Sequence, residues 1–241
     1  MRPIIIVSHG HPSDPAPAAA DLARLATAVA AHLPEWVLRS ATLAEPEAFD
    51  AMVKTLGDGG ALYPLFMAGG WFTRINLPAR LANAGGIGWQ VLEPFGCDPA
   101  LHDLAATVVA EAIADQNAAR AHVLLAAHGS FKSPVPSDIA RHVAEIIQEK
   151  TGAARVEAGF IDQTPQLSSA SGFDVTSLCL PYFAAAGGHV TDDIPAALNQ
   201  AGFKGRILPP LGLDPRVPAL VAAAIRAGTP VCAQECRYRR A

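Results

Sequence analysis

Two short stretches decide the fold of this chain of 241 residues: Arg2–Gly10, which reads RPIIIVSHG, and His122–Ser130, which reads HVLLAAHGS. Each is an apolar run that ends in a His-Gly pair, and His9 and His128 stand 119 positions apart. A short apolar run without alternation is typical of a strand that is buried on both faces of a sheet. We therefore expect the two stretches to be equivalent strands of a duplicated unit.

Further pairs of segments repeat in the same order along the chain. Pro64–Trp71 (PLFMAGGW) matches Pro181–His189 (PYFAAAGGH), and PFGCDPALHDL at 94–104 matches PLGLDPRVPAL at 210–220. Matched blocks in conserved order indicate an internal duplication.

The duplication predicts two homologous domains, 1–118 and 119–241, that are joined near 117–120. Strands alternate with helices in each half, which favours two doubly wound parallel sheets of the α/β class. The second helix of the second half is expected to be weak, because Gln166–Gly172 has poor helix propensity. In the first half the expected strands are Pro3–Ser8, Trp36–Leu43, Ala61–Phe66 and Trp89–Leu92, and the expected helices are Pro17–His32, Glu47–Leu56, Arg74–Ala84 and one from Pro99.

The composition excludes several classes of protein. Hydrophobic residues make up 51% of the chain and charged residues 17%, with a formal net charge of −4. An acidic balance is unlike that of a nucleic-acid binder. The 20 Pro and 20 Gly residues, with scattered charges, interrupt every apolar run, so no run reaches the ~18–20 residues of a membrane span. Because Ile4–Val7 is also too short for a signal peptide, we expect a cytoplasmic protein.

Histidines gather where a ligand is expected in such a fold. Ligands of open parallel sheets bind at the carboxyl ends of the strands. His9 and His128 follow the first strand of each half, and His189 follows the third strand of the second half. Because Gly129, Gly187 and Gly188 would leave space beside the backbone, His128 and His189 could converge on one ligand.

The segment after His189, GGHVTDDIPAAL, carries two carboxylates. Thr191 or Asp192 could cap the next helix, and Asp192 and Asp193 could act only as charges at its first turn. Alternatively, a carboxylate one turn from a ligand histidine can orient the imidazole or take up protons. Both interpretations are open at this point.

These residues resemble a known family. HGS after the first strand, followed by P-x-F…GGH-x-x-DDIP after the third, resembles the class II tetrapyrrole chelatases, which include the sirohydrochlorin cobaltochelatases of the CbiX type and the sirohydrochlorin ferrochelatases. The resemblance covers nearly the whole chain, as the long two-domain form. It implies that two domains face a central cleft, and that His128 and His189 bind the incoming metal and help to deprotonate the tetrapyrrole.

The resemblance implies a lyase-type enzyme that inserts a divalent metal into sirohydrochlorin or a related tetrapyrrole. Co²⁺ is favoured because the long form is similar to the cobalt enzymes, with Fe²⁺ and Ni²⁺ as alternatives. The metal is a substrate, and no tightly bound cofactor is expected. Two imidazoles suit these ions and leave coordination positions open, so that the metal can be released to the macrocycle. The expected partner is the tetrapyrrole, and the chain could be a monomer or a homodimer.

The first half departs from the pattern. Alignment of Gly70 with Gly188 places Trp71 opposite His189 and Arg74 opposite Asp192. We expect Trp71 and Phe72 to stack on the macrocycle and Arg74 to pair with its carboxylates.

Two further residues complete the predicted site. Lys132 follows the HGS turn and is a further candidate for a carboxylate of the macrocycle. His9, like Asp192 and Asp193, could orient the metal ligands without binding the metal itself.

Other functions are weaker matches or rivals. SHGHPS after the first strand lacks the G-x-G-x-x-G of a nucleotide-dependent dehydrogenase. A histidine phosphatase needs an arginine directly before the histidine, where this chain has Ser8 and Ala127. A carrier that binds a tetrapyrrole or a metal without catalysis would use the same groups as a chelatase. Cys232 and Cys236 are too few for a zinc or iron–sulfur site and are expected to be plain thiols on a loose terminus.

Overall fold

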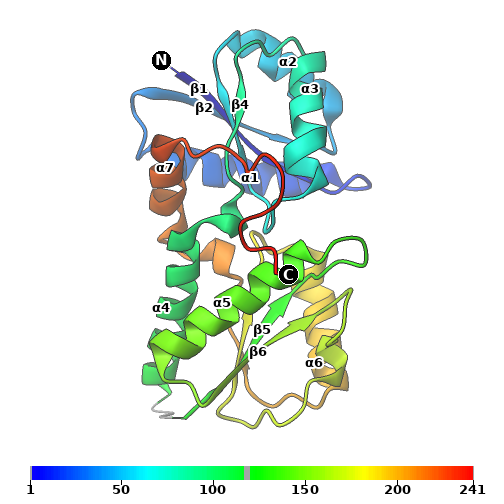
Figure 1. Cartoon of the computed structure of the whole chain (residues 1–241), viewed down its shortest axis with the longest axis vertical. Coiled ribbons are helices and arrows are strands. Elements are labelled where there is room, and N and C mark those ends of the chain that lie inside the picture. Colours follow the sequence, from blue (N-terminus) through cyan, green and yellow to red (C-terminus); the bar gives the residue numbers. More distant parts are fainter. Residues whose placement is uncertain (1, 117–119, 241) are drawn as a thin grey trace. The chain divides into compact units, whose positions relative to one another are not determined.

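The computed structural model describes residues 2–116 and 120–240, so residues 117–119 of the predicted junction lie outside the described part. Two four-stranded sheets form the fold, and every paired strand is parallel to its neighbour (Figure 1). Their strand orders are β2-β1-β3-β4 and β6-β5-β7-β8. The prediction of two doubly wound α/β sheets is therefore confirmed, and the equivalent orders agree with a duplication.

The first sheet is built on β1, whose residues Ile4–Val7 are fully buried. Successive side chains of a strand point to opposite faces, so complete burial means that helices cover both faces. The helices α2 and α3 pack on one face, where Phe49, Val53 and Leu77 join Ile5 and Val7 in one apolar cluster. The strands of this sheet are β1 (Arg2–Ser8), β2 (Trp36–Thr42), β3 (Ala61–Pro64) and β4 (Gln90–Val91), and its helices from the first half are α1 (Pro15–Ala30), α2 (Pro46–Leu56), the π-helix η1 (Phe72–Asn76) and α3 (Leu77–Asn83).

The second sheet repeats this plan around β5. Leu124 and Ala126 of β5 pack with Ile194 and Leu198 of α6. The strands are β5 (His122–Ala127), β6 (Arg155–Phe160), β7 (Leu178–Pro181) and β8 (Arg206–Ile207), and the helices that follow them along the chain are α5 (Val135–Thr151), the π-helix η4 (His189–Asp193) and α6 (Ile194–Gln200).

The compact units of the structure are not identical to the two sequence halves. Unit 1 comprises residues 1–98 and 215–237, and unit 2 comprises residues 99–214 and 238–241. Helix α7 (Val217–Ala227) packs beside α1 in unit 1, and α4 (Pro99–Asp115) packs beside α5 in unit 2 (Figure 1). The last helix of each half thus belongs to the other half's unit. The boundaries 1–118 and 119–241 remain a proposal about sequence homology.

Some local expectations need correction. The weak second helix of the second half is a single 3-10 turn, η3 (Leu167–Ser169), in agreement with its poor propensity. Helix α5 begins at Val135, and the hydroxyl of Ser137 in its first turn donates to the carbonyl of Pro134. The helix expected from Arg74 begins instead as the π-helix η1 and continues as α3.

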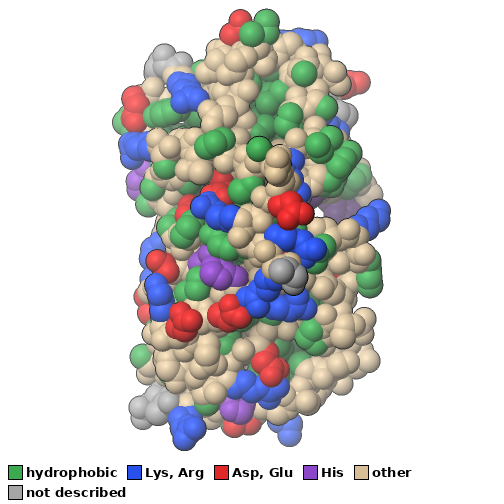
Figure 2. Space-filling view, viewed as in Figure 1, with side chains coloured by type: hydrophobic (Ala, Val, Ile, Leu, Met, Phe, Trp, Pro, Cys, Tyr) green, Lys and Arg blue, Asp and Glu red, His purple; other side chains and the backbone are tan. Residues whose placement is uncertain are grey.

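The described surface carries mixed charge. On the face shown in Figure 2, basic side chains lie interspersed with acidic ones, as the net charge of −4 suggests. Among the helices within 2–116 and 120–240, none combines the length and the apolar character that crossing a bilayer requires.

Candidate metal site

Unit 2 brings His128 and His189 together. His128 follows β5, and His189 begins η4, which follows β7, the neighbour of β5 in the sheet. The two Nε2 atoms lie 3.2 Å apart, and the ring centroids are 4.6 Å apart with ring planes at 86°. Their side chains are 44% and 49% exposed, so both nitrogens lie at an open part of the surface.

An acceptor stands beside the other nitrogen of each ring. Nδ1 of His189 lies 2.7 Å from Oδ2 of Asp193. Nδ1 of His128 lies 3.0 Å from the carbonyl oxygen of Gly129 and 3.6 Å from Oδ2 of Asp162. A proton on each Nδ1 satisfies these acceptors and leaves the lone pairs on the two Nε2 atoms.

In this tautomer the two facing lone pairs repel each other, and a cation between them would be stabilised by both. A metal–nitrogen bond of about 2.0–2.1 Å places two nitrogens of a tetrahedral site about 3.3 Å apart. The observed separation of 3.2 Å between the Nε2 atoms is close to that value. Across the described residues, no three His, Cys, Asp or Glu side chains are arranged to share a metal ion. The pair is therefore suited to hold one proton or one cation, with coordination positions left open.

The acidic residues after His189 have separate roles. Asp193 reaches the imidazole, whereas Asp192 accepts a hydrogen bond from the hydroxyl of Thr191, 3.1 Å away. Neither Thr191 nor Asp192 caps the helix, because the cap of η4 is Gly188 and no side chain bonds to the first turn. The structure thus favours orientation of the imidazole over capping for Asp193.

Sequence reasoning missed Asp162 and its neighbour Gln163. They follow β6, which pairs with β5, and the amide of Asp162 donates to the carbonyl of His128 over 2.9 Å. Gln163 packs against Gly129, where an added Cβ would lie 2.8 Å from that of Gln163. Gly129 also has a φ of +76°, so both the close contact with Gln163 and the backbone conformation favour glycine at this position. The available signal was a polar pair two residues after the end of a strand.

The equivalent position in unit 1 holds an aromatic ring. β3 and β7 pair with the first strands of their sheets in the same way, and the π-helices that follow begin at Phe72 and His189. The ring centroids of His9 and Phe72 are 4.3 Å apart with planes at 90°, much like those of His128 and His189. Phe72 is therefore the counterpart of His189.

This result corrects the alignment that placed Trp71 opposite His189 and Arg74 opposite Asp192. The first half has seven residues between its glycine pair and the next proline, and the second half has six. Counting from the glycines therefore shifts the match by one residue. The extra residue is accommodated before the π-helix, so the helices themselves stay in register.

The carboxylates are also replaced in unit 1. In the same register Asn76 stands opposite Asp193. Ala44 lies two residues beyond the end of β2, as Asp162 lies two residues beyond the end of β6. The pattern of two imidazoles, each with a nearby carboxylate, is therefore a property of unit 2.

The remaining predicted residues lie in both units. Trp71 and Phe72 of unit 1 are 59% and 38% exposed, and their rings meet edge to face at 5.1 Å. Arg74 is half-buried, and its Nη1 is enclosed without a hydrogen-bond partner. Lys132 of unit 2 is exposed, and its backbone amide donates to the hydroxyl of Ser130.

Three of the four cysteines, Cys97, Cys179 and Cys236, are buried, and Cys232 is partly exposed. Cys236 is buried, with its Sγ 3.9 Å from that of Cys97, so the segment around it is not a loose terminus. The hydrogen bond to Cys236 and burial raise the pKa of Cys97 well above its usual value. Burial raises the pKa of Cys179 to about 12. Because metals bind the thiolate, Cys97 and Cys179 are poor ligands.

Comparison with known proteins identifies relatives of the second half of the chain and of nearly its full length. A family model described as CbiX matches residues 122–227. Two sirohydrochlorin cobaltochelatases, from Methanosarcina barkeri and Methanosarcina acetivorans, are 34% and 32% identical to this chain, over 89% of their own length and 41% of this chain.

Two solved structures match over nearly the full length. One is CbiX, the terminal enzyme for biosynthesis of siroheme in denitrifying bacteria, with 45% identity, a TM-score of 0.87 and coverage of 94% of this chain and 99% of that chain. The other is SirB from Bacillus subtilis with Fe³⁺, with 18% identity, a TM-score of 0.74 and coverage of 95% and 96%. The second likeness concerns the fold alone.

Proposed function

The chain belongs to the CbiX family of class II tetrapyrrole chelatases, and on this premise we propose that it inserts a divalent metal ion into sirohydrochlorin. His128 and His189 are the proposed metal ligands and proton acceptors. Asp193 and Asp162 hold their rings.

One observation carries this proposal. The Nε2 atoms of His128 and His189 face each other at 3.2 Å, while Asp193 lies 2.7 Å from Nδ1 of His189. A carboxylate on the far nitrogen fixes the tautomer and makes the near nitrogen a better base and ligand. The arrangement therefore supports both tasks that metal insertion requires.

The reaction exchanges one cation for two protons. The tetrapyrrole core loses two pyrrole N–H protons and gains one M²⁺, so the total charge of the macrocycle does not change. Two imidazoles hold the ion loosely enough for it to pass to the pyrrole nitrogens. Once the metal has left, the facing Nε2 atoms share one of the two released protons and the second passes to solvent at this open part of the surface, while Asp193 and Asp162 stabilise the imidazolium charge.

For the metal we propose Fe²⁺ before Co²⁺. The argument for cobalt was the long two-domain form. The relative that matches over 94% of this chain works in siroheme biosynthesis, and siroheme is an iron tetrapyrrole. The two cobaltochelatases match only 41% of the chain. Fe²⁺ and Co²⁺ both accept imidazole ligands, so cells can select by availability as well as by geometry.

We assign binding of the macrocycle to Trp71, Phe72, Arg74 and Lys132. Exposed aromatic rings can stack on a flat ring system, and cationic side chains can pair with peripheral carboxylates. The enclosed Nη1 of Arg74, which lacks a partner, supports an anionic ligand for this residue.

The deciding experiment is an insertion assay without oxygen. Purified protein is mixed with sirohydrochlorin and either Fe²⁺ or Co²⁺, and the absorption spectrum is followed against a control without protein. We expect a faster change than in the control, with a higher kcat/KM for Fe²⁺. A rate equal to the control, together with tight binding of sirohydrochlorin, would instead support the carrier that binds without catalysis.

A further inference from the structure

A buried carboxylate of unit 2 is held by the last residues of the chain. Asp138 is 4% exposed and lies in the first turns of α5. Its Oδ2 accepts hydrogen bonds from Nη1 of Arg239 at 3.2 Å and from the backbone amide of Arg240 at 3.1 Å. A buried carboxylate is costly unless it is paired and hydrogen-bonded. The C-terminal residues therefore supply donors that Asp138 needs.

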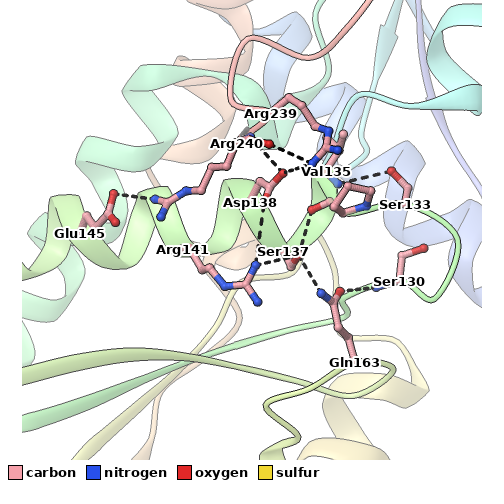
Figure 3. A network of polar contacts seen from close by, with 11 residues as sticks. Ser130, Ser133, Val135, Ser137, Asp138, Arg141, Glu145, Gln163, Arg239 and Arg240 are labelled. Carbon is pink, nitrogen blue, oxygen red and sulfur yellow. Dashed lines mark hydrogen bonds and ion pairs between the residues drawn. The ribbon is translucent and has the colours of Figure 1, made fainter.

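A second contact fixes the same segment to α5. Nη2 of Arg240 donates to Oε2 of Glu145 over 2.6 Å, two turns further along the helix (Figure 3). Residues seven apart lie on one helix face, so both contacts lie along one side of α5. Glu145 is exposed and contributes little by itself. The buried contact at Asp138 is the one with consequences.

Arg141 links Asp138 to the rest of the network. Its Nη1 lies 3.7 Å from Oδ1 of Asp138 and donates to the hydroxyl of Ser137 over 3.2 Å. Its guanidinium also lies over the ring of Phe160, 5.3 Å from the centroid. Phe160 ends β6, two residues before Asp162. The guanidinium of Arg141 therefore contacts three groups: the carboxylate of Asp138, the hydroxyl of Ser137 and the ring of Phe160.

Ser137 connects this network to the loops that carry the proposed metal ligands. Its buried hydroxyl donates to the carbonyl of Pro134 and accepts from Arg141 and from Nε2 of Gln163, the latter at 2.9 Å. Oε1 of Gln163 in turn accepts from the amide of Ser130 at 3.0 Å. Because a hydroxyl has one donor and two acceptor positions, Ser137 is fully used.

The two ends of this network are the C-terminus and the loops of the metal site. Ser130 stands two residues after His128, and Gln163 directly follows Asp162. Figure 3 shows the continuous path of dashed contacts from Arg239 and Arg240 through Asp138, Arg141 and Ser137 to Gln163 and Ser130.

We propose that Arg239 is a positioning residue for the His128–Asp162 pair, and that the C-terminal segment acts on the site through Asp138. Without Arg239, the buried carboxylate of Asp138 loses one of its two neighbouring guanidinium groups and attracts the other, Arg141, more closely. Arg141 then turns away from Ser137, and Gln163 loses the arrangement that holds the amide of Ser130. This inference rests on the proposed function of the pair, and none of the residues in the path is itself a proposed ligand of the metal or of the macrocycle.

The test uses the full chain with Arg239→Ala, and with Arg237→Ala as the matched control. The control substitution removes the same charge from the same segment, but the side chain of Arg237 pairs with Glu93 of unit 1 and not with Asp138. We expect Arg239→Ala to lower kcat for insertion about three- to tenfold with an unchanged KM for sirohydrochlorin. Hydrogen exchange at the amide of Ser130 should become faster. Arg237→Ala should change neither.

A second variant separates positioning from simple loss of stability. In Arg239→Ala/Asp138→Asn the carboxylate that draws Arg141 away is neutral, so kcat and the protection of Ser130 should return toward wild type. Failure of this rescue, or equal behaviour of Arg239→Ala and Arg237→Ala, overturns the inference. If the wild-type protein does not insert metal, the proposed function fails, and hydrogen exchange at Ser130 still decides whether Arg239 holds this loop.

Discussion

Units 1 and 2 share a strand order and a π-helix after the third strand, and they differ at the ends of those elements. In unit 2 a histidine after the first strand meets His189. In unit 1 the equivalent His9 meets Phe72, with ring centroids 4.3 Å apart. The geometry of the two ring pairs is nearly the same, so the difference is one of chemistry. Both units have an edge-to-face ring pair, but unit 1 has the apolar ring of Phe72 where unit 2 has the imidazole of His189 with its lone pair.

The comparison shows that three positions separate the strand edge with the proposed metal ligands from the aromatic one. They are occupied by His189, Asp193 and Asp162 in unit 2 and by Phe72, Asn76 and Ala44 in unit 1. Substitutions at these positions, and at Arg74 near Phe72, test whether they account for the difference between the units.

The largest effect is expected for His189→Ala. It removes one of the two facing Nε2 atoms and should lower kcat for insertion by about 10²–10⁴-fold, the usual contribution of a positioned acid–base group. The side chain is 49% exposed, so the fold should persist, as circular dichroism can verify. His9→Ala is the matched change in unit 1 and should lower the rate less than about threefold, because its neighbour Phe72 cannot bind metal. An equal loss for both would mean that unit 1 contributes to insertion as strongly as unit 2, against the assignment of the reaction to the His128–His189 pair.

The carboxylates should come next. Asp193→Asn should weaken Co²⁺ binding up to about 100-fold, as is common when the partner of a ligand histidine is changed. Asp162→Asn should have a smaller effect, because Asp162 lies 3.6 Å from Nδ1 of His128 against 2.7 Å for Asp193 and its histidine. Titration followed by the visible absorption of Co²⁺ measures both. The reverse order would mean that His128 is the more tightly oriented ligand.

Arg74→Ala should weaken binding of sirohydrochlorin roughly tenfold, since a hydrogen bond to a charged group contributes about 1.5–3 kcal/mol. Binding of Co²⁺ without the macrocycle should hardly change. Fluorescence or absorption titration of the macrocycle provides the first value, and a Co²⁺ titration provides the second. Unchanged macrocycle affinity with lost Co²⁺ affinity would reverse the proposed roles of the two units.

The smallest effect is a gain. In a His189→Ala background, Phe72→His with Asn76→Asp should create a weak Co²⁺ site beside His9. Its affinity should be at least about tenfold below that of the wild-type site, because Ala44 leaves one histidine without a carboxylate. Adding Ala44→Asp should recover part of this difference. No binding in the triple replacement would show that the units differ by more than these three positions.

Much of the fold was predictable from local patterns. Apolar runs that end in His-Gly predict the first strands, because such runs bury both faces of a strand wherever they are placed in the chain. The same reasoning predicted that His128 and His189 lie at one sheet edge. Asp162 was missed because its proximity depends on β6 being the neighbour of β5, which is a long-range pairing.

The alignment of the two halves failed at one place for a related reason. Glycines are conspicuous in a sequence, but the extra residue before η1 is accommodated in the loop, where the chain is least constrained. Packing of Leu77 into the core, where it is fully buried, holds the helix in register instead. Only the tertiary structure shows that Phe72 of unit 1 is the counterpart of His189 of unit 2.

The sequence by itself indicated the α/β class and the family, because both depend on motifs of residues that are close together along the chain. It also predicted an internal duplication and the approach of His128 to His189, because each histidine follows a strand of the same sheet. The tertiary structure decided which carboxylates reach those histidines, which helix joins which unit, and that the last arginines reach Asp138. These depend on which elements pack together. Packing is set by the burial of apolar faces, which many helices could satisfy equally well, and local sequence does not encode the choice.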